Sequence, residues 1–176
     1  MYEEWAAPLP HVVAWRSVTP PGAAPKRILP DGCLDLIWSA GTVFIAGPDT
    51  TAQVAAAAPG TRTAALRFGA GTGSAVLGVP ASEVVDRRVP LEAVWPAAEV
   101  RAIAEAGDPL ATLMAAARRR WAPPDPVMVA LAGAARRGVP VGVVADRCGL
   151  SPRQLQRRSN AAFGYGPKVL HRVLRL

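Results

Sequence analysis

Cysteine and histidine are scarce in this chain of 176 residues, which contains two of each. Cys33 and Cys148 lie far apart and belong to no CxxC motif, which argues against a disulfide framework and against a zinc site. We therefore expect no bound metal, no cofactor and a reducing compartment.

Long apolar runs are missing as well. The longest uncharged stretch, residues 68–82, is rich in glycine and too short to cross a bilayer. Residues 1–5 lack the basic and apolar regions of a signal peptide. These absences predict a cytoplasmic protein with no membrane partner.

Acidic residues are scarce in the last part of the chain. Up to Pro124 there are 11 basic and 11 acidic residues, whereas from Asp125 onward there are nine basic residues against two acidic ones. Lysine and arginine side chains bind phosphates and release counterions, so this uneven distribution indicates a binder of polyanions. A merely solvated surface is the alternative interpretation, and charge alone does not separate the two.

Before residue 68 the hydrophobic pattern is that of short strands. Proline, glycine and aspartate clusters separate the runs and break regular structure between them. The runs that read as strands are residues 12–15, 34–38, 43–46 and 63–68. They predict a compact antiparallel sheet or a small barrel.

After Gly69 the pattern changes to that of helices. The helices expected there are residues 74–78, 81–86 with Ser82 as a cap, 96–106 and 108–121. The adjacent prolines in Pro123–Pro126 then mark a boundary, because neither fits inside a helix. We predict an α+β chain with a β-rich regulatory domain at residues 1–122 and a helical unit at residues 126–176.

The basic C-terminal part has the layout of a three-helix DNA-binding unit. Helices are expected at residues 126–137 and 141–148, followed by a turn at Gly149 and a helix from Ser151. Ser151 is a favoured N-cap, Pro152 suits the first helical position, and Gln154 completes a capping box. The start of the last helix is therefore well defined.

The helix from Ser151 has two different faces. At about 100° per residue, one face carries Leu155, Ser159, Ala162 and Phe163, and the opposite face carries Arg153, Gln156, Arg157 and Asn160. Arginine pairs with guanine, and glutamine and asparagine pair with adenine, in the major groove of DNA. The same residue types also suit a helix surface that only contacts solvent.

The segment 144–158, VADRCGLSPRQLQRR, and the following FGYGPK at 163–168 resemble the first helix-turn-helix of AraC/XylS family transcription regulators. The resemblance implies that the helix from Ser151 enters the major groove of double-stranded DNA and that Arg153, Gln156 and Arg157 contact bases. Stretches near residues 30–36, 45–48 and 66–80 are similar to the N-terminal domain of some of these regulators. The DNA-binding residues expected on this basis are Ser151, Pro152, Arg153, Gln154, Gln156, Arg157, Asn160 and Lys168.

Two departures from the family stand out. Ser159 occupies a position where a large aromatic residue usually holds the recognition helix, so we expect Phe163 to replace it or the unit to be marginally stable. The family also has a second helix-turn-helix unit, which is absent here. An apolar stripe therefore lacks its expected partner. We expect either that the chain is a fragment of a longer regulator, or that the stripe docks on the N-terminal domain or on another subunit. The stripe consists of Val169, Leu170, Val173, Leu174 and Leu176.

The N-terminal domain is expected to hold a small-molecule effector or to form a homodimer. Trp15, Asp31, Asp35 and Trp38 are the candidate pocket residues, although for any single tryptophan an ordinary core position is the favoured interpretation. The alternative function is a small-molecule-binding or dimerisation protein that has lost DNA binding. An enzyme using His11 with the two aspartates ranks third, and we predict no catalytic residues.

Overall fold

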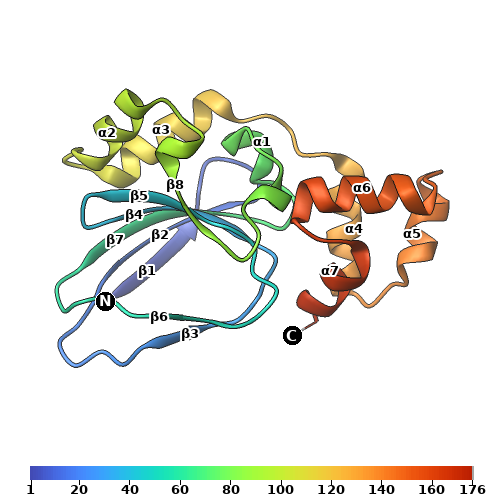
Figure 1. Ribbon diagram of the computed structural model, residues 1–176, viewed down its shortest axis with the longest axis horizontal. Coiled ribbons are helices and arrows are strands. Elements are labelled where there is room, and N and C mark those ends of the chain that lie inside the picture. The colour runs from blue at the N-terminus through green and yellow to red at the C-terminus, as the bar shows by residue number, and fades with distance from the viewer. Residues whose placement is uncertain (176) are drawn as a thin grey trace.

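The computed structural model describes residues 1–175, and it has the predicted α+β architecture (Figure 1). Strands occupy the N-terminal half. They are β1 (Tyr2–Ala6), β2 (Val12–Val18), β3 (Lys26–Ile28), β4 (Leu34–Ser39), β5 (Thr42–Ala46), β6 (Gln53–Ala55), β7 (Arg62–Phe68) and β8 (Arg88–Pro90).

Six strands form an antiparallel sheet in the order β1-β2-β7-β4-β5-β8, and β3 pairs with β6 in a separate ribbon. The four strands expected from the sequence are β2, β4, β5 and β7, which form the centre of the sheet. The sequence did not indicate the edge strands β1 and β8 or the ribbon. These segments are short or polar, and pairing with a neighbour rather than their own pattern makes them extended.

Short and long helices follow the sheet. They are α1 (Ser74–Leu77), the 3-10 helices η1 (Ala81–Glu83) and η2 (Leu91–Ala93), α2 (Ala97–Ala104), α3 (Pro109–Arg120), α4 (Pro126–Arg136), α5 (Val141–Arg147), α6 (Pro152–Phe163) and α7 (Pro167–Val173). The expected helix 81–86 was wrong in extent and in its cap: it is the single turn η1, preceded by Pro80. The expected start of α3 is confirmed, since the Asp108 carboxylate accepts the backbone N–H of Ala111 at 3.0 Å.

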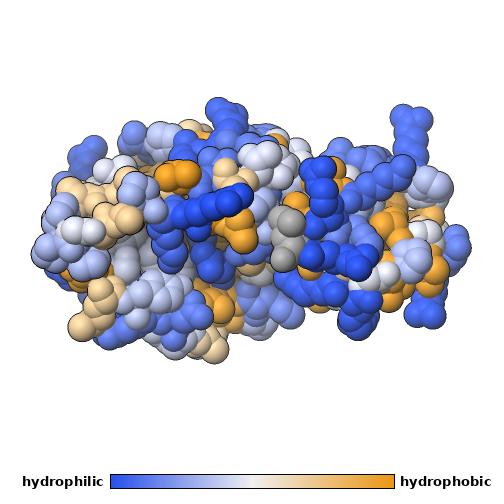
Figure 2. Space-filling model, turned by 90° about the horizontal axis from the view of Figure 1, so that it is seen from below, coloured by the Kyte–Doolittle hydropathy of each residue, from blue (hydrophilic) through white to orange (hydrophobic). Residues whose placement is uncertain are grey.

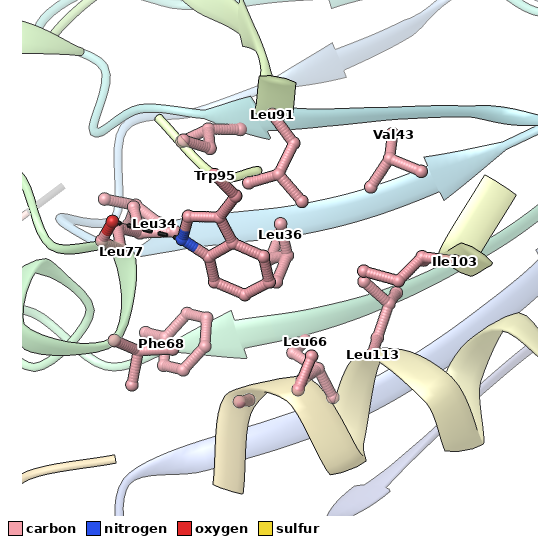
Figure 3. Packing of buried hydrophobic residues seen from close by; sticks show 14 of the residues in the cluster. Leu34, Leu36, Val43, Leu66, Phe68, Leu77, Leu91, Trp95, Ile103 and Leu113 are labelled. Atoms are coloured by element: carbon pink, nitrogen blue, oxygen red, sulfur yellow. Dashed lines mark hydrogen bonds between the residues drawn. The ribbon is translucent and has the colours of Figure 1, made fainter. Parts of the chain in front are cut away.

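Helices α2 and α3 cover one face of the sheet and bury the first hydrophobic core (Figures 1 and 3). Leu36, Leu66 and Phe68 point from the strands toward Trp95 and Leu113, and all five are almost completely buried. The Trp95 indole N–H donates to the Leu77 carbonyl at 3.2 Å. This bond satisfies the one polar group that the indole brings into the core.

A second core lies among α4, α5, α6 and α7. Met128, Leu131, Leu155 and Phe163 are buried there, and Ala70 from the N-terminal half joins the same cluster. The apolar stripe of α7 packs mainly here, within the C-terminal unit, and not chiefly on the N-terminal domain or on another subunit as predicted. Its members Leu170 and Val173 are buried in this core, Val169 and Leu174 pack against it, and Leu176 lies outside the described residues. Within residues 1–175, no helix is long and apolar enough to cross a membrane.

Candidate nucleic-acid interface

The N-terminus of α6 is stabilised by the capping box that the sequence predicts. The Ser151 hydroxyl accepts the Gln154 backbone N–H at 3.3 Å, and the Gln154 side-chain oxygen accepts the Ser151 backbone N–H at 2.9 Å. At the other end Gly164 adopts a left-handed conformation with φ of 83°, which ends the helix. Both ends of α6 are therefore set by local hydrogen bonds.

The two predicted faces of α6 are confirmed. Leu155, Ser159 and Phe163 are buried, whereas Arg153 and Arg157 are exposed. Six of the eight expected DNA-binding residues line one hollow on the surface of α6. These are Ser151, Arg153, Gln154, Gln156, Arg157 and Asn160.

The polar side chains in this hollow differ in whether other residues of the chain already occupy their hydrogen-bonding groups. Gln156 donates its amide N–H to the Asn160 side-chain oxygen at 3.0 Å and packs against the backbone of Gly166. Within the described residues, Arg153 and Arg157 take part in no ion pair. The two guanidinium groups therefore keep their donors available for an anion or a base.

Most of the basic residues in the C-terminal unit share this exposure. Lys168, on α7, is exposed, and so are seven of the eight arginines that follow Asp125. Figure 2 shows strongly hydrophilic side chains gathered over part of this unit. The net positive charge that the sequence assigns to this end of the chain thus lies on its surface.

Arg158 is the exception, because it pairs with Asp125. Its guanidinium donates to both carboxylate oxygens, with Nε lying 3.0 Å from Oδ2. Burial opposes ionisation of Asp125, but the hydrogen bonds from Arg158 and from the Val127 backbone lower the pKa of its carboxyl below the ordinary value. The pair joins α6 to the N-cap of α4 and so helps to orient the exposed face.

Ser159 is completely buried, and its hydroxyl donates to the Tyr165 backbone carbonyl at 2.8 Å. The hydrogen bond ties the middle of α6 to the turn before α7. Phe163 and Tyr165, which are 1% and 6% exposed, supply aromatic packing in the same region. The resemblance to AraC/XylS regulators predicts one large aromatic residue at position 159. Here two aromatic residues further along the chain, Phe163 and Tyr165, occupy the core instead.

Three loops of the N-terminal half hold the C-terminal end of α6, and we call residues 31–33, 70–74 and 81–85 the seat. Phe163 lies against Gly71, where an added Cβ would be 2.5 Å from the ring carbon Cε1. The Ser74 hydroxyl donates to the Ala161 carbonyl at 3.2 Å. These contacts fix the last turn of α6 against the sheet domain, while its first turns extend away from that domain (Figure 1).

The turn that follows α6 completes the contact with the seat. Gly164 lies beside the Ala81 carbonyl and the Val85 side chain, and an added Cβ would be 3.1 Å from each. Tyr165 and Leu174 lie against Gly32. Burial, with the nearby Asp31 and Cys33, raises the pKa of the Tyr165 phenol, and its hydroxyl has no hydrogen-bond partner among the described residues.

The candidate effector residues do not form one site. Trp15 and Asp35 meet on the sheet face opposite α2 and α3, where the Trp15 indole N–H donates to Asp35 Oδ1 at 3.3 Å. Arg67, which the sequence analysis missed, donates to both Asp35 oxygens at 3.1 and 3.2 Å. Burial raises the pKa of the Asp35 carboxyl, while the charge and hydrogen bonds of Arg67 oppose this.

Trp38 and Asp31 lie elsewhere. Trp38 is three residues from Asp35 in one strand, so it points to the other face, where its indole N–H donates to the Ala104 carbonyl at 3.0 Å. It lines an open groove of about 690 Å³ between the sheet and the start of α3. Asp31 is exposed and accepts the Cys33 backbone N–H at 2.8 Å, as expected for a turn aspartate.

Cys33 and His11 differ in their surroundings. Burial, together with Asp31 and Asp35, raises the pKa of the Cys33 thiol to about 12, so the thiol is protonated at neutral pH. His11 is exposed at the turn between β1 and β2. Within residues 1–175 no group of three or more histidine, cysteine, aspartate or glutamate side chains is placed to hold a metal ion.

The sheet domain has a counterpart among known protein families. Residues 7–90 match the model of a domain of unknown function, DUF6597. The DUF6597 match begins after β1 and ends with β8, so it covers Trp15, Asp35 and Arg67 but none of α2 to α7. No curated protein and no solved structure matches the chain.

Proposed function

We propose that this chain is a sequence-specific DNA-binding transcription regulator of the AraC/XylS type. The observation that carries the proposal is the row of exposed Arg153, Gln156 and Arg157 and half-buried Asn160 on a well-capped helix whose other face is buried. The major groove of B-DNA is about 12 Å wide and admits one α-helix. The row matches the residue types that read base edges there.

The charge and the docking of α6 support the same proposal. The exposed basic residues of the C-terminal unit can contact phosphates on both sides of the groove. The seat holds the C-terminal end of α6, whereas Arg153 lies in the first turn, so docking on the sheet domain leaves Arg153 exposed. Lys168, at the start of α7, would add a phosphate contact.

One such unit reads few base pairs, and a specific affinity of about 10⁻⁸ to 10⁻¹¹ M normally needs a second reading element. We therefore include a homodimer on paired half-sites in the proposal. In it, the DUF6597 domain receives the signal, from a small-molecule effector or from the subunit contact, and changes how α6 is presented. The alternative is a binding or dimerisation protein without DNA contacts.

The test begins with duplexes that carry a randomised 20-base-pair core, enriched by repeated binding to the full chain. Fluorescence anisotropy then compares the enriched sequence with a scrambled duplex from 50 to 200 mM salt. Arg153→Ala and Arg157→Ala should each lose about 1–3 kcal/mol of discrimination. Arg101→Ala is the matched control, because this exposed arginine lies on α2 at the far end of the molecule (Figure 1).

If no sequence is enriched, or if all three variants bind alike, the chain does not read DNA through α6. The alternative function then becomes the better interpretation. Sedimentation of the chain with one and two half-sites measures whether a dimer forms on DNA.

A further inference from the structure

The half-buried ion pair between Asp35 and Arg67 lies close in the chain to two of the seat loops. Asp35 is near the start of β4 and Arg67 is near the end of β7, and the two residues are direct partners in the strand register. Trp15 adds a hydrogen bond from the adjacent strand β2. Side chains thus join three neighbouring central strands close to the strand ends from which two of the seat loops leave.

Two of the three seat loops begin within a few residues of this pair. Gly32, which contacts Tyr165 and Leu174, precedes Asp35 by three residues, and Gly71, which contacts Phe163, follows Arg67 by four residues. Such segments span at most about 11 and 14 Å when fully extended. Because the segments are this short, we expect a change in the spacing of β4 and β7 at the ion pair to move the two loops relative to each other.

The C-terminal unit fits the seat with little freedom to adapt. Phe163 rests directly on the Gly71 backbone, and Leu174 lies where an added Cβ at Gly32 would be 3.0 Å away. Close-packed contacts of this kind transmit displacement, because interiors are dense and have low compressibility. The position of α6 then depends on how the two loops are held.

We propose that Asp35 and Arg67 are positioning residues for α6, and that their ion pair sets the two seat loops against Phe163 and Tyr165. In this arrangement the pair touches no DNA and acts on recognition through the seat. The consequence for DNA binding rests on the proposed function, whereas the effect on the seat does not.

Tyr165 contacts the seat, so a resonance of this side chain reports on the contact. The resonance can be assigned because the chain has only two tyrosines. The full chain is labelled with 3-fluorotyrosine, and its two ¹⁹F resonances are assigned with Tyr2→Phe. In Asp35→Asn we expect the Tyr165 resonance to shift or broaden. Glu99→Gln is the matched control, because it breaks an ion pair with Arg119 and Arg120 that links α2 to α3. None of these three residues lies in or next to a seat loop.

Trp15→Phe serves if Asp35→Asn does not fold, because it removes one hydrogen bond and leaves the ion pair in place. It should move the Tyr165 resonance in the same sense by a smaller amount. An unchanged Tyr165 resonance in every folded variant, or an equal change in Glu99→Gln, would overturn the proposal.

Anisotropy on the enriched duplex provides the second measurement. Asp35→Asn should weaken binding by at least about 5-fold, the lower end of typical coupling between sites, and Glu99→Gln should not. A moved Tyr165 resonance with a wild-type chain that binds no duplex supports the positioning role and refutes the proposed function. A moved resonance with undiminished DNA affinity overturns the proposed effect on recognition.

Discussion

Replacing Gly71 by alanine tests whether the sheet domain and α6 form one packed unit. Gly71 has φ of 80°, where a non-glycine residue costs about 1–2 kcal/mol. The new Cβ would also lie 2.5, 3.1 and 3.2 Å from three ring carbons of Phe163. Moving this buried ring costs about 1–3 kcal/mol more, the usual range for overpacking.

Gly60→Ala separates the two effects. Gly60 has the same φ of 80°, and an added Cβ there meets nothing within 4 Å. The backbone strain and the lower entropy of the unfolded chain are therefore shared by both variants. For a chain of this size the packing difference should make Gly71→Ala melt about 2 to 12 °C below Gly60→Ala.

Thermal unfolding followed by circular dichroism measures this difference. A smaller side chain should relieve the contact, so the extra cost of Gly71→Ala should shrink in the Phe163→Leu background. Equal melting temperatures for Gly71→Ala and Gly60→Ala would refute the contact between Gly71 and Phe163. An extra cost that is the same in both backgrounds would show that another neighbour causes it.

Three further predictions concern ion pairs and DNA contacts. Arg158→Ala should cost about 1 kcal/mol in urea unfolding, and Asp125→Ala should cost about 1 kcal/mol more because it also removes the N-cap of α4; equal costs would contradict this. The hydrogen bond from Arg120 is the main cause of the lowered pKa of Glu99. The stabilisation by the ionised Glu99 carboxylate is therefore fully present above pH about 4.3 and is lost as the pH falls further. Glu99→Gln should therefore melt below wild type at pH 7 and approach it near pH 3, whereas a constant gap would contradict the sign. Lys168→Ala should reduce the slope of log K against log salt by about 1 without changing sequence preference, and an altered preference would contradict a phosphate contact.

Local chemistry explains why α6 could be predicted closely. Its capping box joins Ser151 to a residue only three positions away, and Gly164 ends the helix through its own backbone conformation. The buried and exposed faces follow from the helical period alone. The candidate DNA-binding residues Arg153 and Arg157 were therefore visible in the sequence before any fold was known.

The geometry of the sheet explains why the sequence analysis grouped Trp38 with Asp35 and missed Arg67. Trp38 could have been separated from Asp35 earlier, because an odd spacing within one strand places two side chains on opposite faces. Arg67 carried a weaker signal: it is a charged residue between two buried apolar residues of β7. Its pairing with Asp35 depends on the register of β4 and β7, which neither strand specifies by itself.

The α+β order of elements, the central strands, the basic C-terminal surface and the two faces of α6 follow from the amino-acid sequence. These features depend on periodicity, composition and hydrogen bonds between near neighbours. Three features become visible only in the folded chain: Phe163 and Tyr165 dock on the sheet domain, the Tyr165 carbonyl accepts the Ser159 hydroxyl, and Asp35 pairs with Arg67. Apart from the Ser159 bond, whose partners are six positions apart, those contacts join residues far apart in the chain, and their geometry exists only when both partners have folded.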